Sequence, residues 1–164
     1  MKDIELYNLI KDYYVNRQRL NHFFLDSSFQ PLFVNILTFI RKSHYSKALD
    51  ILNLSTLLLS RHSQAELKRL LRFLYLTANS THAPRLCETK PNNSILLNDF
   101  ASCLISHKLI GFEESRLLLN FMLNNFDHLF RMNKSIEDSI NRRKFLMQKY
   151  GHEEPVLGII FLNF

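Results

Sequence analysis

Residues that form turns are scarce in this chain of 164 residues, which contains only 3 glycines and 4 prolines. Glycine and proline interrupt helices, so their scarcity favours a helical chain. Apolar residues make up 46% of the sequence and charged residues 22%, which is the balance of a globular protein and not of a disordered one. The length suits one domain with a sizeable core.

Cysteine is also rare, and the two present, Cys87 and Cys103, form no CxxC pair. The first ten residues contain charges throughout, which excludes a secretory signal there. We therefore expect a reducing compartment, a cytoplasmic location, and both thiols buried as small apolar groups. No apolar run approaches the ~20 residues that a membrane-spanning helix needs, so no such segment is predicted.

Motifs that carry chemistry are missing as well. The 7 histidines include no HxxxH or HExxH pair, the sequence has no GxSxG, and 3 glycines leave little room for a phosphate-cradling loop. The sequence thus predicts no metal site, no cofactor and no catalytic residues.

The formal charge of +6 is the one feature that favours an acidic partner such as nucleic acid or an anionic membrane. The basic residues are scattered, with short clusters at Lys68-Arg69-Arg72 and Arg142-Arg143-Lys144. Neither cluster is as long as a basic tail, so we favour simple solubility, and nucleic acid is not the favoured partner. A basic helical binder of nucleic acid or membrane surfaces stays as an alternative function.

Apolar residues recur at helical spacing along most of the chain, which predicts an all-α fold of about seven helices. The first helix is expected over 3–15, followed by a connector over 16–28. Ser28 is expected to cap the second helix, with Pro31 in its first turn, and a third helix begins near Tyr45. Ser63 and Glu66 are spaced as a capping box for the fourth.

A loop is expected over 79–93, because this stretch contains Pro84, Pro91 and several small polar residues. Further helices are predicted over 94–106, from Phe112, and over 135–150. The helix from Phe112 is apolar on most faces and should be buried centrally. We therefore expect a single domain over 1–150 and an apolar tail over 151–164, whose sequence VLGIIFLNF must pack against something or promote aggregation.

Three leucine-rich stretches resemble the helical core of Rho-GAP domains: Leu32–Leu37, Ala48–Leu59 and Leu67–Leu74. The segment Phe100-Ala101-Ser102-Cys103-Leu104 falls where that superfamily has F-x-P-x-L. The resemblance implies a Rho-GAP-like helical bundle.

More narrowly, the chain resembles the C-terminal Rho-GAP-like region of the DEP-domain-containing proteins. The stretches that carry this likeness are Pro84–Cys87, Phe100–Ile105, Glu113–Leu123 and Lys149–Pro155. The likeness covers most of the chain but does not include the DEP domain itself, so we expect the sequence to be either a fragment of a longer protein or an incomplete gene model. A role in intracellular signalling or cytoskeletal assembly is implied.

The resemblance implies a module without catalysis. A working GTPase-activating domain supplies an arginine that stabilises charge during phosphoryl transfer, and in this superfamily it lies upstream of the matched region. The superfamily's helix lysine is matched by Lys11, but its arginine position holds Val15, and the proline turn that follows is absent from 16–20. The supporting asparagine falls on Ile95. We therefore predict an interaction module for a Rho-family GTPase or another signalling protein.

The candidate GTPase-binding residues are the matched lysine, the two arginines of the early connector and the asparagines near Ile95: Lys11, Arg17, Arg19, Asn92, Asn93 and Asn98. The alternative is an active GTPase-activating domain, in which Arg17 or Arg19 would be the arginine donor.

Overall fold

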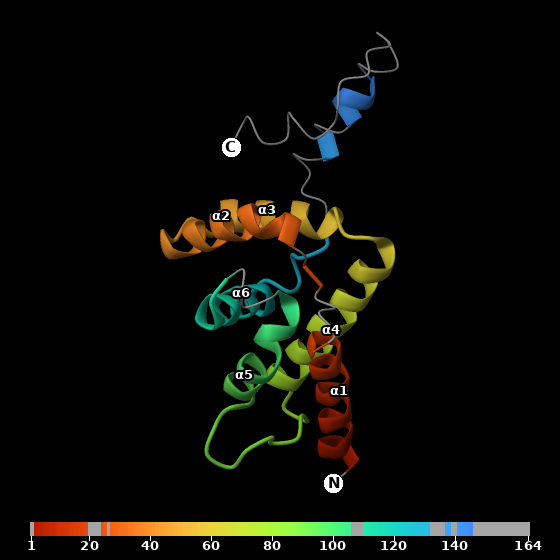
Figure 1. Cartoon of the computed structure of the whole chain (residues 1–164), viewed down its shortest axis with the longest axis vertical. Helices are drawn as coiled ribbons and strands as arrows, with labels where there is room; N and C mark the ends of the chain where they lie inside the picture. The colour runs from red at the N-terminus through yellow and green to blue at the C-terminus, as the bar shows by residue number, and fades with distance from the viewer. Residues whose placement is uncertain are drawn as a thin grey trace. The chain divides into compact units, whose positions relative to one another are not determined.

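The computed structural model describes residues 2–19, 24–25, 27–105, 110–131, 137–138 and 141–145. Within these residues the chain forms six α-helices and one short 3₁₀-helix, with no strand, as predicted for an all-α fold. The elements of Figure 1 are α1 (Lys2–Arg19), η1 (Ser27–Phe29), α2 (Gln30–Arg41), α3 (Tyr45–Leu57), α4 (Arg61–Asn79), α5 (Asn92–Leu104) and α6 (Phe112–Asn124).

The chain divides into two compact units, Met1–Arg131 and Met132–Phe164. All the named helices belong to the first. In the second, residues 137–138 and 141–145 are helical, inside the helix predicted over 135–150. The rest of that helix and the tail over 151–164 lie outside the described residues. The domain boundary at residue 150 stays a prediction.

Helix α1 runs to Arg19, four residues beyond the predicted end at Val15. The connector expected from residue 16 therefore begins later, and Arg17 is helical. Residues 16–19 include no glycine or proline, and Arg17 pairs with Glu66 of α4, which stabilises this last turn. Tyr7 and Tyr14 lie two turns apart on the same face of α1 and are buried.

Helices α2 and α3 lie next to each other (Figure 1) and are joined by a short turn in which Ser43 has a φ of 60°. Pro31 stands in the first turn of α2, as predicted, where its missing N–H costs nothing. The predicted Ser28 cap is wrong. Ser28 belongs to the 3₁₀-helix, so that Phe29 takes the capping position without a side-chain hydrogen bond.

Helix α4 begins at Arg61, before the predicted capping box. Ser60 is the residue that caps it, and its Oγ accepts a hydrogen bond from the Ser63 backbone N–H at 3.1 Å. The Ser63 hydroxyl is in turn 2.9 Å from the Ser60 hydroxyl. The prediction of a capping box at Ser63 is therefore wrong. The Glu66 side chain does not cap the helix but forms an ion pair with Arg17 of α1.

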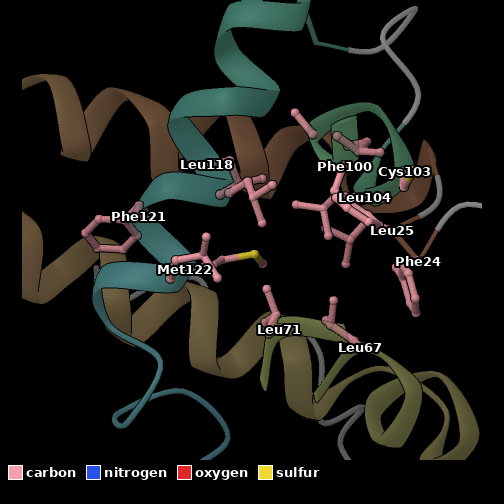
Figure 2. Close-up of a cluster of buried hydrophobic side chains, with 14 of the residues drawn as sticks. Phe24, Leu25, Leu67, Leu71, Phe100, Cys103, Leu104, Leu118, Phe121 and Met122 are labelled. Atoms are coloured by element: carbon pink, nitrogen blue, oxygen red, sulfur yellow. The ribbon is translucent and has the colours of Figure 1, made fainter. Parts of the chain in front are cut away.

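The core lies where α4, α5 and α6 meet (Figure 2). Its members are fully or almost fully buried and include Leu67, Leu71, Phe100, Leu104, Leu118 and Met122. The prediction that α6 is a buried helix is thus confirmed. Leu25 is also buried and its backbone N–H donates to the Leu104 carbonyl at 3.0 Å, which ties the segment before α2 to the end of α5.

The two cysteines have different environments, although both were expected to be buried. Cys103 of α5 is 3% exposed, as predicted. Cys87 lies in the loop between α4 and α5, and its Sγ is exposed, 3.4 Å from the Thr89 hydroxyl. That hydrogen bond, together with the amides of Thr89 and Lys90, lowers the pKa of Cys87 to about 7. The prediction failed for Cys87 because the polar loop bonds to its sulfur at the surface.

Replacing Phe100 should test the core directly. Phe100 is fully buried and touches Tyr7, Tyr14 and Phe73, so we expect Phe100→Ala to lower the free energy of unfolding by about 3–5 kcal/mol. The matched control is Phe112→Ala on the 41% exposed Phe112, which should cost less than about 1 kcal/mol. Urea denaturation followed by circular dichroism measures both. Equal losses for the two variants would contradict this core.

Candidate functional site

Helix α1 carries three of the six predicted site residues, Lys11, Arg17 and Arg19, and α5 carries the other three. Helix α1 runs alongside α4 and α5 (Figure 1). Tyr7 and Tyr14 fix it there, each with its ring edge towards Phe100 of α5, at 6.1 and 6.3 Å between centroids. The polar residues of α1 therefore meet α5 on one side and α4 on the other.

On the α5 side, Asp99 is bound by two residues of α1. The Tyr7 hydroxyl donates to Asp99 Oδ2 at 2.6 Å, and Lys11 Nζ lies 2.9 Å from the same oxygen. Burial, with a further contribution from Asp99, raises the pKa of Tyr7 far above its ordinary value, so the phenol keeps its proton. The Lys11 side chain, 35% exposed, is thus held at the α1–α5 contact with part of its surface open.

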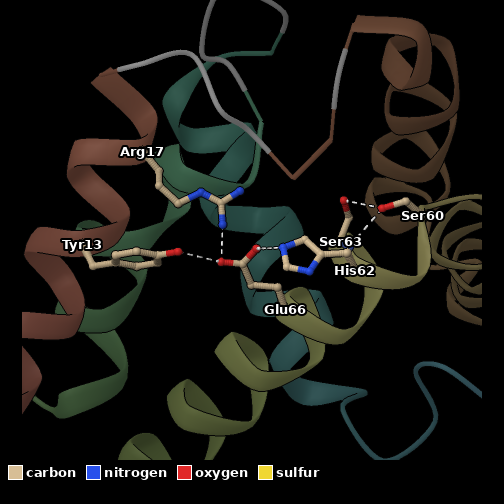
Figure 3. A network of polar contacts seen from close by, with 6 residues as sticks. All are labelled: Tyr13, Arg17, Ser60, His62, Ser63 and Glu66. Carbon is tan, nitrogen blue, oxygen red and sulfur yellow. Dashed lines mark hydrogen bonds and ion pairs between the residues drawn. The ribbon is translucent and has the colours of Figure 1, made fainter.

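On the α4 side, Glu66 is the centre of a polar network (Figure 3). Arg17 forms an ion pair with it, and the Tyr13 hydroxyl donates to Glu66 Oε1 at 3.2 Å. His62 Nε2 lies 3.7 Å from the other carboxylate oxygen. Burial raises the pKa of Glu66, but hydrogen bonds and charge from Arg17 outweigh that effect and leave the pKa below its ordinary value.

Arg17 lies on a helix and not on a connector, which corrects the expectation for this residue. Its guanidinium binds Glu66 and lies 5.1 Å from the centre of the Phe24 ring. A guanidinium that serves phosphoryl transfer must reach the transferring phosphate, whereas this one already has a carboxylate partner. Arg19 ends α1, and its side chain lies outside the described residues.

Asn92 braces the loop that precedes α5. Its amide nitrogen donates to the carbonyls of Thr77 and Pro84 at 3.0 and 2.9 Å, and its amide oxygen accepts from the Leu86 N–H at 3.0 Å. These three bonds use most of the hydrogen-bonding capacity of the side chain. Asn92 is therefore placed as a structural residue.

The predicted residues do not form one cluster. Asn98 is exposed and precedes Asp99, the partner of Lys11, but a helix turns by about 100° per residue, so Asn98 points away from the direction of Asp99. Asn92 and the half-buried Asn93 begin α5, about two helical turns earlier. Arg17 lies on the α4 side of α1.

Asp99, Glu66 and Tyr13 are the residues that the sequence reasoning missed. Glu66 is the only acidic residue on a helix that carries several arginines and lysines, which is a signal that it has a specific partner. The local spacing after Ser63 assigned it to a cap instead. Its true partner lies 49 residues away in the sequence, and only tertiary structure brings the two together.

The described residues include no group of three histidine, cysteine or acidic side chains placed to hold a metal ion. Ser60, Ser63 and His62 also lie close together, but the two hydroxyls bond to each other and not to the imidazole. His62 is instead paired with Glu66. In the same part of the chain, no helix is long and apolar enough to cross a membrane.

Changing Glu66 should alter the pH dependence of stability. A carboxylate whose pKa is lowered by folding adds stability above its unfolded pKa, and this stability is lost as the pH falls through the folded pKa. We therefore expect Glu66→Gln to cost about 1–3 kcal/mol at pH 7, and its cost to shrink as the pH falls from about 5 towards 3.

Urea denaturation at several pH values measures this. The control is Glu88→Gln in the exposed loop, which should change the free energy of unfolding by less than about 0.5 kcal/mol. A cost for Glu66→Gln that is constant from pH 7 to pH 3 would contradict the ion pair with Arg17.

Comparison with known proteins finds that the chain is similar to DEP domain-containing proteins. No family model matches the chain, and no solved structure matches it. DEP domain-containing protein 1B of Gallus gallus is 22% identical over 148 residues, which are 88% of this chain and 27% of that protein. DEP domain-containing protein 1A of Danio rerio is 27% identical over 121 residues, or 70% of this chain and 15% of that protein.

The chain thus spans about a quarter or less of the length of the curated relatives it matches. At this level of identity, it is similar to DEP domain-containing proteins 1A and 1B over most of its own length.

Proposed function

We propose that this chain is a non-catalytic, Rho-GAP-like interaction module of intracellular signalling, and that a small GTPase is its candidate partner. The observation that carries the proposal is the similarity to DEP domain-containing protein 1B over 88% of the chain. The all-α architecture agrees with a Rho-GAP-like bundle. A cytoplasmic location goes with this proposal, because a chain with only two cysteines suits a reducing compartment.

The environment of Arg17 supports binding without catalysis. An arginine donor must be free to approach the phosphates of the bound nucleotide. Arg17 is held in place by Glu66, and moving it away from that carboxylate would leave a partly buried negative charge without its main partner. The active GTPase-activating domain therefore ranks second, with Arg17 or Arg19 as its only candidate donors.

The α1–α5 contact is the surface we propose for the GTPase. Lys11 lies at this contact and is partly open to solvent, and we include the exposed Asn98, which precedes Asp99 on α5, as its neighbour. A lysine and an asparagine offer donors to the acidic and carbonyl groups of a protein partner. Asn92 is better explained by the loop that it braces.

The test is a panel of GTP-loaded Rho-family GTPases, with both affinity and rate of GTP hydrolysis measured. We expect binding to at least one GTPase and no acceleration. Lys11→Ala combined with Asn98→Ala should weaken binding by roughly tenfold, because each lost contact to a charged or polar partner is worth about 0.5–1.5 kcal/mol. Lys90→Ala, on the loop, is the control and should leave binding unchanged.

Each other outcome rejects a part of the proposal. Acceleration that disappears in Arg17→Ala would favour the active domain. Absence of binding to every member of the panel would reject the GTPase as partner. Binding that the double substitution leaves unchanged would reject the α1–α5 surface.

The basic nucleic-acid or membrane binder is the remaining alternative, favoured by the exposed Lys68, Arg69 and Arg72 of α4. Such binding depends on release of counterions and weakens steeply with salt. Titration with single-stranded RNA, duplex DNA and anionic vesicles at two salt concentrations separates it from the main proposal.

A further inference from the structure

Helices α1 and α4 enclose an open groove of about 620 Å³. Its apolar lining comes from Leu9, Ile10 and Tyr13 of α1 and from Leu70 and Phe73 of α4. Leu9 is 67% exposed and Tyr13 54%, so part of this apolar lining faces solvent. Exposed apolar surface of this kind, flanked by charges, is typical of a protein interface.

The two helices that form the groove have outer faces of matching pattern and opposite charge. On α1, the spacing i, i+4, i+7 and i+11 places the exposed residues Glu5, Leu9, Asp12 and Asn16 on one face. On α4, the same spacing places the exposed residues Ala65, Arg69, Arg72 and Leu76 on one face. One face is therefore acidic with an exposed leucine, and the other is basic with an exposed leucine.

None of these four charges has an ion-pair partner within the described residues. Glu66, the carboxylate of α4, pairs with Arg17, and Lys11 of α1 pairs with Asp99. Asp12 and Arg69 both line the groove, from opposite walls, and no ion pair joins them in the described part of the chain. Two acids and two bases thus remain available to a partner.

The charges also stand at matching heights along the groove. Tyr7 stacks on Phe73 and Arg17 pairs with Glu66, so α1 and α4 run in opposite directions. Counting from these two contacts, Asp12 is level with Arg69, and Glu5 with Arg72, each within about one helical turn. If a second copy is generated by a rotation of 180° about an axis parallel to the groove, each residue keeps its position along the groove. The α1 wall of one copy then faces the α4 wall of the other.

We propose that this face binds a second copy of the chain, through a two-fold axis that runs along the groove. In that arrangement α1 of each copy lies over α4 of the other. Asp12 then meets Arg69, Glu5 meets Arg72, and Leu9 and Leu76 cover the apolar lining. Each contact occurs twice, as in any two-fold interface.

The charge pattern selects this occupant over others. A two-fold axis across the groove would place the acidic face on the acidic face and the basic face on the basic face. A uniformly acidic or uniformly basic partner would meet like charge on one of the two walls, which is unfavourable. In the stated orientation, a second copy brings opposite charge to both the acidic wall and the basic wall. The interface does not use Lys11 or Asn98, so it is independent of the proposed GTPase surface.

Sedimentation velocity of the full 164-residue chain, over about 1–200 μM, tests the proposal, because a small interface of this kind gives a weak dimer. We expect a monomer–dimer equilibrium. Asp12→Arg and Arg69→Asp should each weaken it at least about tenfold, because both symmetric contacts become repulsive. Glu88→Arg and Lys90→Asp make the same charge changes on the loop and should leave the equilibrium unchanged.

Mixing the two charge-reversed variants is the decisive arm. In a heterodimer of Asp12→Arg with Arg69→Asp, both contacts at these positions again join opposite charges, so the mixture should recover dimer that neither variant forms alone. This recovery also shows that both variants are folded. A wild-type chain that stays monomeric would overturn the proposal. A dimer whose affinity is unchanged by both substitutions would also overturn it, as would a mixture that associates no more tightly than either variant alone.

Discussion

The position of α1 depends on the contact of its two buried tyrosines with Phe100. Tyr7 and Tyr14 lie on one face of α1, and both meet the same ring of α5. Phe100 is itself fully buried among the residues that α4 and α6 bring to the core. Aromatic contacts of this kind add both buried area and a preferred orientation. This contact fixes the rotation of α1 about its own axis, and that rotation determines where the polar side chains of α1 lie.

That rotation explains why Lys11 and Arg17 are both paired with carboxylates. Because Tyr7 and Tyr14 point into the core, Lys11 lies on the side of α1 that faces α5, and Arg17 lies on the side that faces α4. Each side holds one carboxylate, Asp99 on α5 and Glu66 on α4, and each cation takes the one nearest to it. A partly buried carboxylate without such a partner would be costly, so these pairs hold α1 in place. Residues that resemble a binding set in the sequence thus act first as structural contacts.

The sequence predicted those features that depend on spacing alone. The periodic apolar residues of α4 and α6 gave both helices and their buried faces, because burial of one face requires that period. The prediction of helix caps was less reliable, because two neighbouring residues can both have the right chemistry for a cap. Ser60 and Ser63 are both good capping residues three positions apart, and which of them caps α4 depends on where the chain leaves α3.

The charge network around Glu66 could not be predicted from the sequence for a different reason. Arg17 and Glu66 are 49 residues apart, and although Glu66 stands out as the only acid of α4, the sequence does not say which residue is its partner. Their pairing follows only from the packing of α1 against α4. The same limit applies to the groove: the spacing of Glu5, Leu9, Asp12 and Asn16 is visible in the sequence, as is that of Ala65, Arg69, Arg72 and Leu76. That the two faces are neighbours, antiparallel and level with each other is a tertiary fact.

Helix α1 therefore has separate roles on separate faces. Its inner face, with Tyr7 and Tyr14, is used by the core, and the Lys11 side is the one we propose for a GTPase. Its outer face, with Leu9 and Asp12, is the one we propose for a second copy. Lys11 and Asp12 are consecutive, and a helix turns by about 100° per residue. The two proposed surfaces therefore lie at the same level of α1 but face different directions. A dimer of this kind would carry two copies of the proposed GTPase surface, and two linked surfaces raise the avidity for any membrane or scaffold that presents the GTPase in many copies.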